Sequence, residues 1–474
     1  MVSVLRKETK TAARYRLITI SATILLLNGA IARAQTDWPT FGFDSQRTGY
    51  NPYETVLSVT TVPNLKLQWT QAFACPFTAQ PIEGNGVLYV ADWCGVIRAV
   101  DPGSGKVFWS RQLGASPTSC GDFLPLTSLG ILGTPAFDSA NNRLFVASGD
   151  DQVYALDPAT GLDKPGYPVE VMNPPNRAPA TAVYGGLLLV GNSLYLTSAS
   201  GDCENPPFHG QVLQVDVTPS GTSKVIRRWF PMGYNGPSGG GIWGPGGLSL
   251  NPQGTALFTA TGNAQIFPEN APNGDAVIRL GLNLALQAAN SPADLCCQAN
   301  DIDMGSTPVL YGQACLAVLD KDGTLYVYKR YAINSGPVQE LLITPNTEQF
   351  TQDVAYDANL GQVYVVNPAD DAAGIYRHGV LAFTAASDCT LTLAWQQQFG
   401  SSGNPFDNPI SPVAANGVVY ATRQMDGIVA AFNGETGDYL WSMTAGGPIF
   451  GAPSVVNGQV FVTDSNGNLF AFGP

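Results

Sequence analysis

The sequence predicts an all-β fold, a closed eight-bladed β-propeller, and three observations lead to it. A strand–turn–strand unit occurs at residues 95–109 (GVIRAVDPGSGKVFW), returns at 427–441 (GIVAAFNGETGDYLW) and has a weaker copy at 151–161 (DQVYALDPATG). A repeated unit of this kind cannot bury its own apolar faces, so it needs neighbours to stack on. The chain contains 52 Gly and 35 Pro with only 12% charged residues, which suits many short strands joined by tight turns. The third observation is that the last unit lacks its outer strand, and a matching strand stands at the other end of the chain.

Residues 1–34 are predicted to be a signal peptide that lies outside the fold. Basic residues precede an apolar run at residues 17–27, and Ala32-Arg33-Ala34 forms an A-x-A cleavage site. The run is shorter than the roughly 20 apolar residues of a membrane span, and no later stretch approaches that length. An uncleaved anchor is the alternative. We therefore expect a periplasmic or secreted protein with no transmembrane segment after signal removal.

The rest of the chain is strongly acidic. Without the six basic residues and one acidic residue of the signal segment, 17 Lys+Arg and 35 Asp+Glu remain, a net charge of −18. An acidic surface repels phosphate backbones, so we expect no nucleic-acid partner.

Eight repeat units follow an irregular, polar lead at residues 35–63, and they form one propeller domain at residues 64–474. Each unit has an apolar strand of the type GVLYVADW, a hairpin marked by Gly or Asp, and a strand of the type GVIRAVD. The first of these strands are expected at residues 86–93, 142–150, 192–200, 255–262, 313–321, 361–367, 417–423 and 458–465. Their partner strands start at Gly95, Asp151, Gly210, Gly274, Gly323, Gly379, Gly427 and Gly467. Sheets of four short strands, repeated eight times, are the pattern of a β-propeller.

The ring is predicted to close through its two ends. The last unit ends at Gly473-Pro474, directly after its third strand, and the segment NLKLQWTQAF (residues 64–73) precedes the first complete unit. Pairing this segment with residues 469–472 would place Trp69 in the last blade and remove two free sheet edges. An open solenoid is the alternative, but it needs polar caps that the sequence does not show.

The cysteines indicate disulfides, as suits an exported chain. The eight cysteines are Cys75, Cys94, Cys120, Cys203, Cys296, Cys297, Cys315 and Cys389, and eight cysteines allow 105 connectivities. We expect Cys94 and Cys120 to lie within disulfide distance because they bracket one unit. Cys296 and Cys297 are expected either to bridge each other or to have separate partners.

The repeat G-x-x-x-A-x-D-x-x-T-G-x-x-x-W resembles the tryptophan-docking repeat of the pyrroloquinoline-quinone (PQQ) family of propellers. This family includes quinoprotein alcohol dehydrogenases, polyvinyl-alcohol dehydrogenase and the outer-membrane assembly scaffold BamB. The resemblance covers about residues 38–474 and implies a propeller of quinoprotein type. The same repeat serves enzymes and binding scaffolds, so it is more specific for the fold than for the function.

The resemblance also implies a cofactor site. GGGIWGPGGLSLNPQGTALFTATGN (residues 239–263) is similar to the quinoprotein segment whose Trp forms the cofactor floor and whose terminal Asn binds Ca²⁺, which points to Trp243 and Asn263. A planar quinone favours an aromatic face, and Ca²⁺ favours oxygen ligands. SASGDCENPPFHGQVLQVD (residues 198–216) resembles the segment with a second calcium ligand, here Glu204.

Two further segments resemble the catalytic part of that site. NDIDMGSTP (residues 300–308) is similar to the stretch that carries the catalytic Asp, which implies Asp301 or Asp303. LDKDGTLYVYKR (residues 319–330) resembles the segment whose basic residue contacts the quinone, here Lys321. We expect Trp243, Asn263, Asp303 and Lys321 to converge at one mouth of the central channel.

Each of these residues has a structural alternative. Trp243 can pack between blades, Asn263 can serve a turn at a strand end, and the Asp301 and Asp303 carboxylates can cap a turn. Lys321 can be a solvated hairpin residue and Glu204 a loop carboxylate.

The sequence thus implies an exported, quinoprotein-like oxidoreductase that uses PQQ and Ca²⁺ to oxidise a small-molecule alcohol and passes electrons to an acceptor. The alternative is a non-catalytic, BamB-like propeller that binds a protein or a glycan. The adjacent-cysteine lid of the alcohol dehydrogenases is missing from the first blades, which favours the scaffold, whereas the order of the four site residues favours the enzyme.

Overall fold

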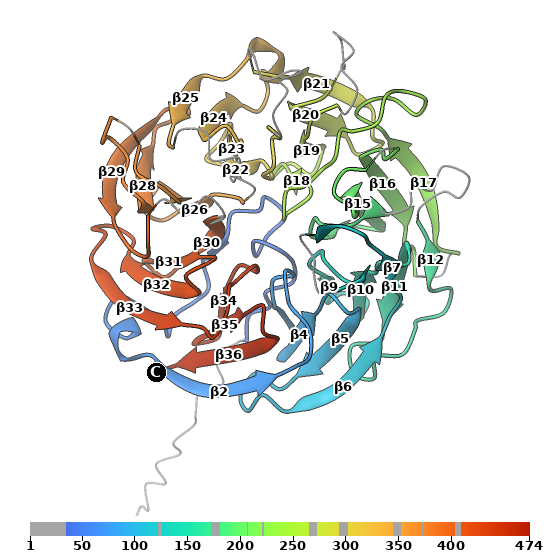
Figure 1. Cartoon of the computed structure of the whole chain (residues 1–474), viewed down its shortest axis with the longest axis horizontal. Helices are drawn as coiled ribbons and strands as arrows, with labels where there is room; N and C mark the ends of the chain where they lie inside the picture. Colours follow the sequence, from blue (N-terminus) through green and yellow to red (C-terminus); the bar gives the residue numbers. More distant parts are fainter. Residues whose placement is uncertain are drawn as a thin grey trace, which may run out of the picture. The chain divides into compact units, whose positions relative to one another are not determined.

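Eight antiparallel sheets are arranged in a ring in the computed structural model of the chain (Figure 1). The structure describes residues 35–121, 126–171, 181–205, 207–219, 222–264, 273–292, 302–344, 352–371, 373–402 and 409–474. The predicted signal peptide, Asp301 and the Cys296-Cys297 pair lie outside the described residues. Residues 35–474 form one compact unit. Within the described ranges, no helix has the length and apolarity needed to cross a membrane.

Each blade has four strands that follow one another outward from the centre of the ring, and the sheets of blades 3 and 7 each carry one additional short strand, β13 and β1 (Figure 1). The inner strands of blades 1 to 8 are β3 (Ile82–Gly84), β9 (Ala136–Asp138), β14 (Leu188–Val190), β18 (Ser249–Leu250), β22 (Val309–Tyr311), β26 (Ala355–Asp357), β30 (Pro409–Ala415) and β34 (Ser454–Val456). The second strands are β4 (Val87–Ala91), β10 (Arg143–Ala147), β15 (Ser193–Ser200), β19 (Ala256–Thr261), β23 (Cys315–Leu319), β27 (Gln362–Asn367), β31 (Val418–Arg423) and β35 (Gln459–Thr463).

The outer half of each blade repeats the same order. The third strands are β5 (Val96–Val100), β11 (Gln152–Leu156), β16 (Gln211–Asp216), β20 (Ala276–Gly281), β24 (Thr324–Lys329), β28 (Gly379–Ala385), β32 (Ile428–Asn433) and β36 (Asn468–Gly473). The outer strands are β6 (Val107–Gln112), β12 (Val169–Glu170), β17 (Lys224–Trp229), β21 (Leu286–Asn290), β25 (Gln339–Leu342), β29 (Leu391–Gln397), β33 (Tyr439–Thr444) and β2 (Lys66–Ala72). The remaining elements are β1 (Tyr50–Asn51), β7 (Ser116–Pro117), β8 (Ser128–Leu129), β13 (Thr181–Ala182), and the short 3₁₀ helices η1 (Val62–Asn64) and η3 (Ile333–Ser335).

Burial explains why the second and third strands are nearly continuous apolar runs. Every residue of β10 and of β23 is buried, because a neighbouring blade covers each face of the sheet. The outer strand β6 instead alternates half-buried and exposed residues, since only one of its faces meets a neighbour. The eight-bladed all-β prediction is confirmed.

The ring closes as the sequence predicted. Strand β2 pairs antiparallel with β36, and Trp69 lies opposite Ala471 in that ladder. The first described outer strand therefore completes the last blade (Figure 1). This pairing joins the two ends of the chain and leaves no incomplete blade at the junction.

Tryptophans at the outer strands bind neighbouring blades to one another. The indole Nε1 of Trp109 donates a hydrogen bond of 2.9 Å to the carbonyl of Pro158 in the turn of the next blade. Trp69 and Trp395 make the same bond to Pro102 and Gly434. The repeat therefore carries its own connector between blades, which is the reason for the spacing of its Asp, Gly and Trp positions.

The lead at residues 38–51 threads the inside of the ring. It bonds in turn to the inner part of every blade, through its pairs with Glu83, Phe137, Leu187, Leu250, Leu310, Tyr356, Ala414 and Val455. Within it, Tyr50 and Asn51 form β1, which pairs parallel with β30. Arg47 is almost fully buried there and donates to the carbonyls of Leu248 and Gly186. The lead is thus a part of the propeller that ties all eight blades together.

The disulfide prediction for Cys94 and Cys120 is wrong. Cys94 is bonded to Cys75 and Cys120 to Cys203, with Cα–Cα distances of 6.0 and 5.0 Å. A third bridge joins Cys315 and Cys389 across blades 5 and 6, at 5.4 Å. The prediction assumed that bonded cysteines bracket one unit. Cys75 and Cys94 instead meet at the start of blade 1, whereas Cys120 bonds to Cys203 in a loop of blade 3.

Candidate functional site

Four of the predicted site residues lie in loops on one face of the ring. Asn263 follows β19 and Lys321 follows β23, so both stand where a second strand turns into a third. Trp243 and Asp303 precede the inner strands β18 and β22. In antiparallel blades, these two kinds of loop emerge on the same face, which we call the long-loop face. The topology therefore brings blades 4 and 5 together at this point.

Asp303 is the centre of the cluster. Its Oδ1 accepts a hydrogen bond of 2.9 Å from the backbone N–H of Asn263, 40 residues away. Its Oδ2 accepts one of 2.7 Å from the ammonium of Lys321, and its carbonyl accepts the backbone N–H of Lys321 at 3.1 Å. The Asp303 side chain is fully buried, while 13% of the Lys321 side chain is exposed. The ion pair therefore presents its basic partner toward solvent.

Trp243 lies against the same cluster. A Cβ built on Gly262 would stand 2.0 Å from Asp303 Oδ1 and 3.0 Å from Trp243 Nε1. The Gly262 backbone therefore lies close to both groups. A Cβ on Gly241 would meet the indole nitrogen at 2.7 Å. The ring of Tyr184 packs against the Trp243 indole, with centroids 5.2 Å apart. Glycine is required at both positions because any side chain would collide with the cluster.

Two polar atoms of this cluster are buried without a hydrogen-bond partner in the described ranges. They are the side-chain oxygen Oδ1 of Asn263 and the indole Nε1 of Trp243. The docking tryptophans, by contrast, all donate to a carbonyl. A buried oxygen acceptor and a buried N–H donor of this kind are unfavourable unless a ligand or a water satisfies them.

The structure adds two buried carboxylates that the sequence reasoning did not single out, Asp275 and Asp320. Burial raises the pKa of Asp320 well above its ordinary value, and the charges of Asp322, Asp275 and Asp303 raise it further. A sequence signal existed for Asp320, because Asp92 and Asp464 occupy the same place at the end of a second strand. Those two residues cap their loops by accepting backbone N–H groups. Asp320 also accepts a backbone N–H, from Asp322 at 2.8 Å, but only Asp320 of the three lies near the Asp303 carboxylate of the cluster.

Glu204 lies in blade 3, in the loop after β15. It is half-buried, has a positive φ of 56°, and its backbone N–H donates to the hydroxyl of Ser200. The Cys120–Cys203 disulfide anchors this loop one residue before Glu204. Farther along the loop, His209 forms a bridge with Gly239, which in turn bridges Ala264 beside Asn263. The loop that carries Glu204 is therefore connected to the blade 4 cluster through one intervening segment.

The imidazole of His209 is harder to protonate here than a free imidazole. Burial lowers the pKa of its imidazole below the ordinary value. At neutral pH the ring is therefore uncharged, and it offers hydrogen bonding to the loop and no positive charge to an anion.

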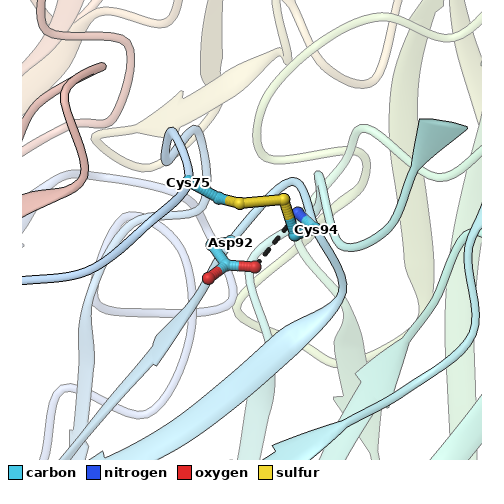
Figure 2. Close-up of side chains that lie close together, drawn as sticks. All are labelled: Cys75, Asp92 and Cys94. Atoms are coloured by element: carbon cyan, nitrogen blue, oxygen red, sulfur yellow. Dashed lines mark hydrogen bonds between the residues drawn. A yellow bond between two sulfur atoms is a disulfide. The ribbon is translucent and has the colours of Figure 1, made fainter. Parts of the chain in front are cut away.

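A group of possible metal ligands on the same face has a different role. The side chains of Cys75, Asp92 and Cys94 come together in blade 1, and the two sulfur atoms form a disulfide (Figure 2). Asp92 Oδ1 accepts the Cys94 N–H at 3.0 Å, and Asp92 Oδ2 pairs with Arg98 at 2.6 Å. Because cysteine binds metals as a thiolate, the disulfide removes both sulfur atoms as ligands. This group therefore stabilises the loops of blade 1 through a disulfide, a hydrogen bond and an ion pair.

A shallow cleft with room for little more than a water molecule lies between blades 2 and 3 on the long-loop face. Its lining includes Ser116, Ser148, Thr181 and Val183. Tyr184, the neighbour of Trp243, packs with Leu129 and Ala182 of the same lining. The cleft therefore reaches the aromatic side of the cluster.

Family models match both ends of the propeller. A model described as the β-propeller domain of glucose/ethanol/alcohol dehydrogenase matches residues 38–171, and one described as outer membrane protein assembly factor BamB matches residues 378–473. A polyvinylalcohol dehydrogenase from Pseudomonas sp is 24% identical over 489 residues, which cover 86% of this chain and 70% of the relative.

Solved structures share the fold. Quinohemoprotein alcohol dehydrogenase from Comamonas testosteroni superposes with a TM-score of 0.68 at 14% identity, over 92% of this chain and 80% of that protein. BamB from Moraxella catarrhalis superposes with a TM-score of 0.56 at 13% identity, over 86% of this chain and all of that protein (100%). Both likenesses extend over most of the ring.

Proposed function

Because the chain belongs to the PQQ-type β-propeller family, we propose that it is an exported oxidoreductase that uses PQQ and Ca²⁺ to oxidise an alcohol. The single observation that carries this proposal is the convergence of Asn263, Asp303 and Lys321 with Trp243. These residues come from two blades and are up to 78 positions apart in the sequence (243 to 321). A general packing role would not require an ion pair beside a buried amide oxygen that has no hydrogen-bond partner in the described residues.

The side chains at the cluster suit the two proposed groups. Asn263 Oδ1 is a buried oxygen acceptor without a partner in the described part of the chain, which is what a hard cation such as Ca²⁺ takes up. Because residues 241 and 262 are glycines, no side chain from these two positions covers the Trp243 indole nitrogen or the Asp303 carboxylate. An indole face and an ammonium are suitable partners for a planar, anionic quinone. The donor set therefore fits both groups.

In this proposal Asn263 and Glu204 would hold Ca²⁺, and Trp243 and Lys321 would contact PQQ. Bound PQQ would supply the acceptor for the two electrons that leave the alcohol. The protein's part is to bind the substrate, to orient it and to accept its hydroxyl proton. Asp303 is the base for that proton, because its carboxylate is held in a single orientation by the Asn263 N–H and the Lys321 ammonium.

The ion pair couples two of these tasks. While Asp303 is ionised, the charge of Lys321 is neutralised at 2.7 Å. When Asp303 accepts a proton, the ammonium loses its partner and its positive charge becomes available to the rest of the site. Lys321 would thereby oppose negative charge at the moment when proton transfer has occurred. Asp301 is the second candidate base, because it stands two residues before Asp303.

The substrate is proposed to be an alcohol that approaches the cluster from the long-loop face. The curated relative is named for polyvinyl alcohol, so a secondary alcohol, free or in a polymer, is the first substrate class to examine. A separate electron acceptor would have to remove the two electrons afterwards.

The test is titration of the purified protein with PQQ in the presence and absence of Ca²⁺, followed by the absorbance of the quinone. We expect a Ca²⁺-dependent spectral shift that Asn263→Ala and Trp243→Ala abolish. Trp69→Phe is the matched control, because Trp69 is a docking tryptophan in blade 8 and should leave the titration unchanged. No shift at high micromolar PQQ in the wild type would contradict the enzyme proposal.

That negative result would support a second candidate, a binding scaffold for a protein or a glycan. The observation that favours the scaffold is the match of residues 378–473 to the BamB model. This range covers blades 7 and 8 and the outer half of blade 6, where none of the candidate site residues lies. The titration therefore separates the two functions.

A further inference from the structure

Glu83 on the inner strand of blade 1 is a buried carboxylate, and one of its two oxygens has no hydrogen-bond partner in the described residues. It is 1% exposed, its Oε1 accepts hydrogen bonds from Gln35 Nε2 at 2.8 Å and from Asn457 Nδ2 at 2.7 Å, and its Oε2 has no partner in the described residues. The charged groups that act on it there are the acidic side chains Asp37 and Glu54. The two amide donors favour the ionised form, but burial and the neighbouring carboxylates outweigh them and raise the pKa of Glu83 to about 7, so a cation at Oε2 would stabilise its charge.

Gln35 and its neighbours lie across the junction of the ring. Thr36 exchanges two backbone hydrogen bonds with the side-chain amide of Asn457, at 3.0 and 2.9 Å. Asn457 belongs to blade 8 and Glu83 to blade 1, so residues 35–37 connect the last blade to the first. The Gln35 side chain also packs on Gly86, where a Cβ would stand 2.8 Å from Gln35 Nε2. Gln35 is therefore anchored on blade 1, and Thr36 beside it is anchored on blade 8.

The position of Gln35 in the sequence adds a second, independent observation. The residue directly follows Ala32-Arg33-Ala34, which has the form of a cleavage site. The compact unit of the protein also begins at Gln35. Cleavage at that site would create a new α-amino group on the residue that already contacts Glu83.

We propose that the chain is cut between Ala34 and Gln35 and that the new α-ammonium group docks on the Glu83 carboxylate, closing the junction between blades 1 and 8. The cut is a hydrolysis by an endopeptidase of the signal-peptidase class. Water adds across the Ala34–Gln35 peptide bond, Ala34 leaves with the carboxylate, and Gln35 retains the amine, which is protonated at neutral pH. The ion pair unites a cation with the one Glu83 oxygen that lacks a partner. Maturation of the chain thereby stabilises the ring at its junction.

The first test is the identity of the mature N-terminus after export from a bacterial host. Intact mass and N-terminal sequencing are expected to give Gln35 with a free amine. Another start site would overturn the proposal. A mass lower by one ammonia would also overturn it, because an N-terminal glutamine that cyclises loses both the α-ammonium and the Nε2 donor to Glu83.

The second test is a thermodynamic cycle on the folded, full-length mature protein. A form with one additional serine before Gln35 moves the charge away, and we expect its thermal midpoint to fall by about 1–3 °C at pH 7. In Glu83→Gln the same extension should change the midpoint by less than half that amount. Glu170→Gln, at an exposed position on outer strand β12, is the matched control and should preserve the full effect. An equal effect of the extension in wild type and Glu83→Gln would overturn the proposal.

A measurement that needs no variant completes the test. The α-amine of a docked terminus should react with an amine-specific reagent at pH 7 at least several-fold more slowly than the amine of a free Gln-Thr-Asp peptide. Equal rates would contradict docking. This readout does not depend on the proposed oxidoreductase function, so the two proposals can fail separately.

Discussion

Lys321 and Asp303 form an ion pair of 2.7 Å between two loops that flank the inner hairpin of blade 5. The two residues lie 18 positions apart and also share a backbone hydrogen bond. Their burial is unequal, because Asp303 is fully buried and Lys321 is partly exposed. This asymmetry decides what each substitution should do.

We expect Lys321→Met to be more destabilising than Asp303→Asn. Lys321→Met leaves a carboxylate buried without its cation, which costs about 3–5 kcal/mol, whereas Lys321 in Asp303→Asn can still turn toward water. Urea unfolding of both variants measures the two free energies. Lys164→Met is the matched control, because its pair with Asp157 is partly exposed and should contribute only about 0–1 kcal/mol. Equal losses for the two variants of the buried pair would contradict this prediction.

The docking turn of blade 2 should not tolerate a side chain at Gly161. This glycine has a φ of 71°, and a Cβ would stand 2.6 Å from Trp109 Cε3. Gly161→Ala is expected to lose about 2–4 kcal/mol of unfolding free energy, from the left-handed backbone and the collision together.

Gly166→Ala is the control for this substitution. Its φ is 86°, but nothing lies within 4 Å of the added Cβ. It should lose about 1–2 kcal/mol, from the backbone alone. Equal losses at the two glycines would show that the indole contact adds no constraint.

The disulfides should stabilise the ring in proportion to the loops they close. The Cys120–Cys203 bridge closes 83 residues and the Cys75–Cys94 bridge closes 19. In the chain-entropy description these loops correspond to about 4.5 and about 3 kcal/mol. Replacing each pair with serine and measuring urea unfolding tests this order. A larger loss for the shorter loop would contradict it.

The Cys120–Cys203 pair should also affect ligand binding, since it anchors the loop of Glu204. We expect the serine pair at these positions to weaken the Ca²⁺-dependent quinone titration, while the serine pair at 75 and 94 leaves it unchanged. Calcium affinity measured on the folded variants is the readout. The same affinity in both variants would remove Glu204 from the proposed site.

Stability should decrease as the pH rises from about 4 to about 7 because of Asp353. Burial raises the pKa of this carboxyl from its ordinary value of 3.8 to about 7. A group whose pKa is raised by folding stabilises the protein below its unfolded value and loses that contribution as the pH rises through its folded value. Asp353→Asn should therefore flatten this part of the profile in urea unfolding between pH 4 and pH 8.

Asp101→Asn is the control for the pH profile, because Asp101 lies in a docking turn between β5 and β6 at the surface of the ring. Its profile should follow the wild type. A slope that persists in Asp353→Asn would assign the pH dependence to other buried groups, such as Glu83, whose pKa burial raises to about 7.

Much of the fold could be predicted because short sequence patterns specify the strands and turns of each unit. The strand period, the Gly and Asp turns and the Trp of each unit recur along the chain, so the unit and its number can be counted. The missing outer strand of the last unit also pointed to β2, since an unpaired edge requires a partner. The resemblance placed Trp243, Asn263, Asp303 and Lys321 in order along neighbouring units and led us to expect that they converge, but it did not say which of them form bonds.

The sequence by itself therefore determined the architecture and the kinds of groups in the candidate site. Only the tertiary structure decided which groups touch: the ion pair of Lys321 with Asp303, the partner of Cys120, and the path of the lead through the ring. Thr36 and Asn457 bond across 421 residues, and Cys120 and Cys203 across 83. A residue type limits what bond can form, but several residues of each type are available. The choice among them depends on which loops the closed ring brings within a few ångströms, and that distance is a property of the whole fold.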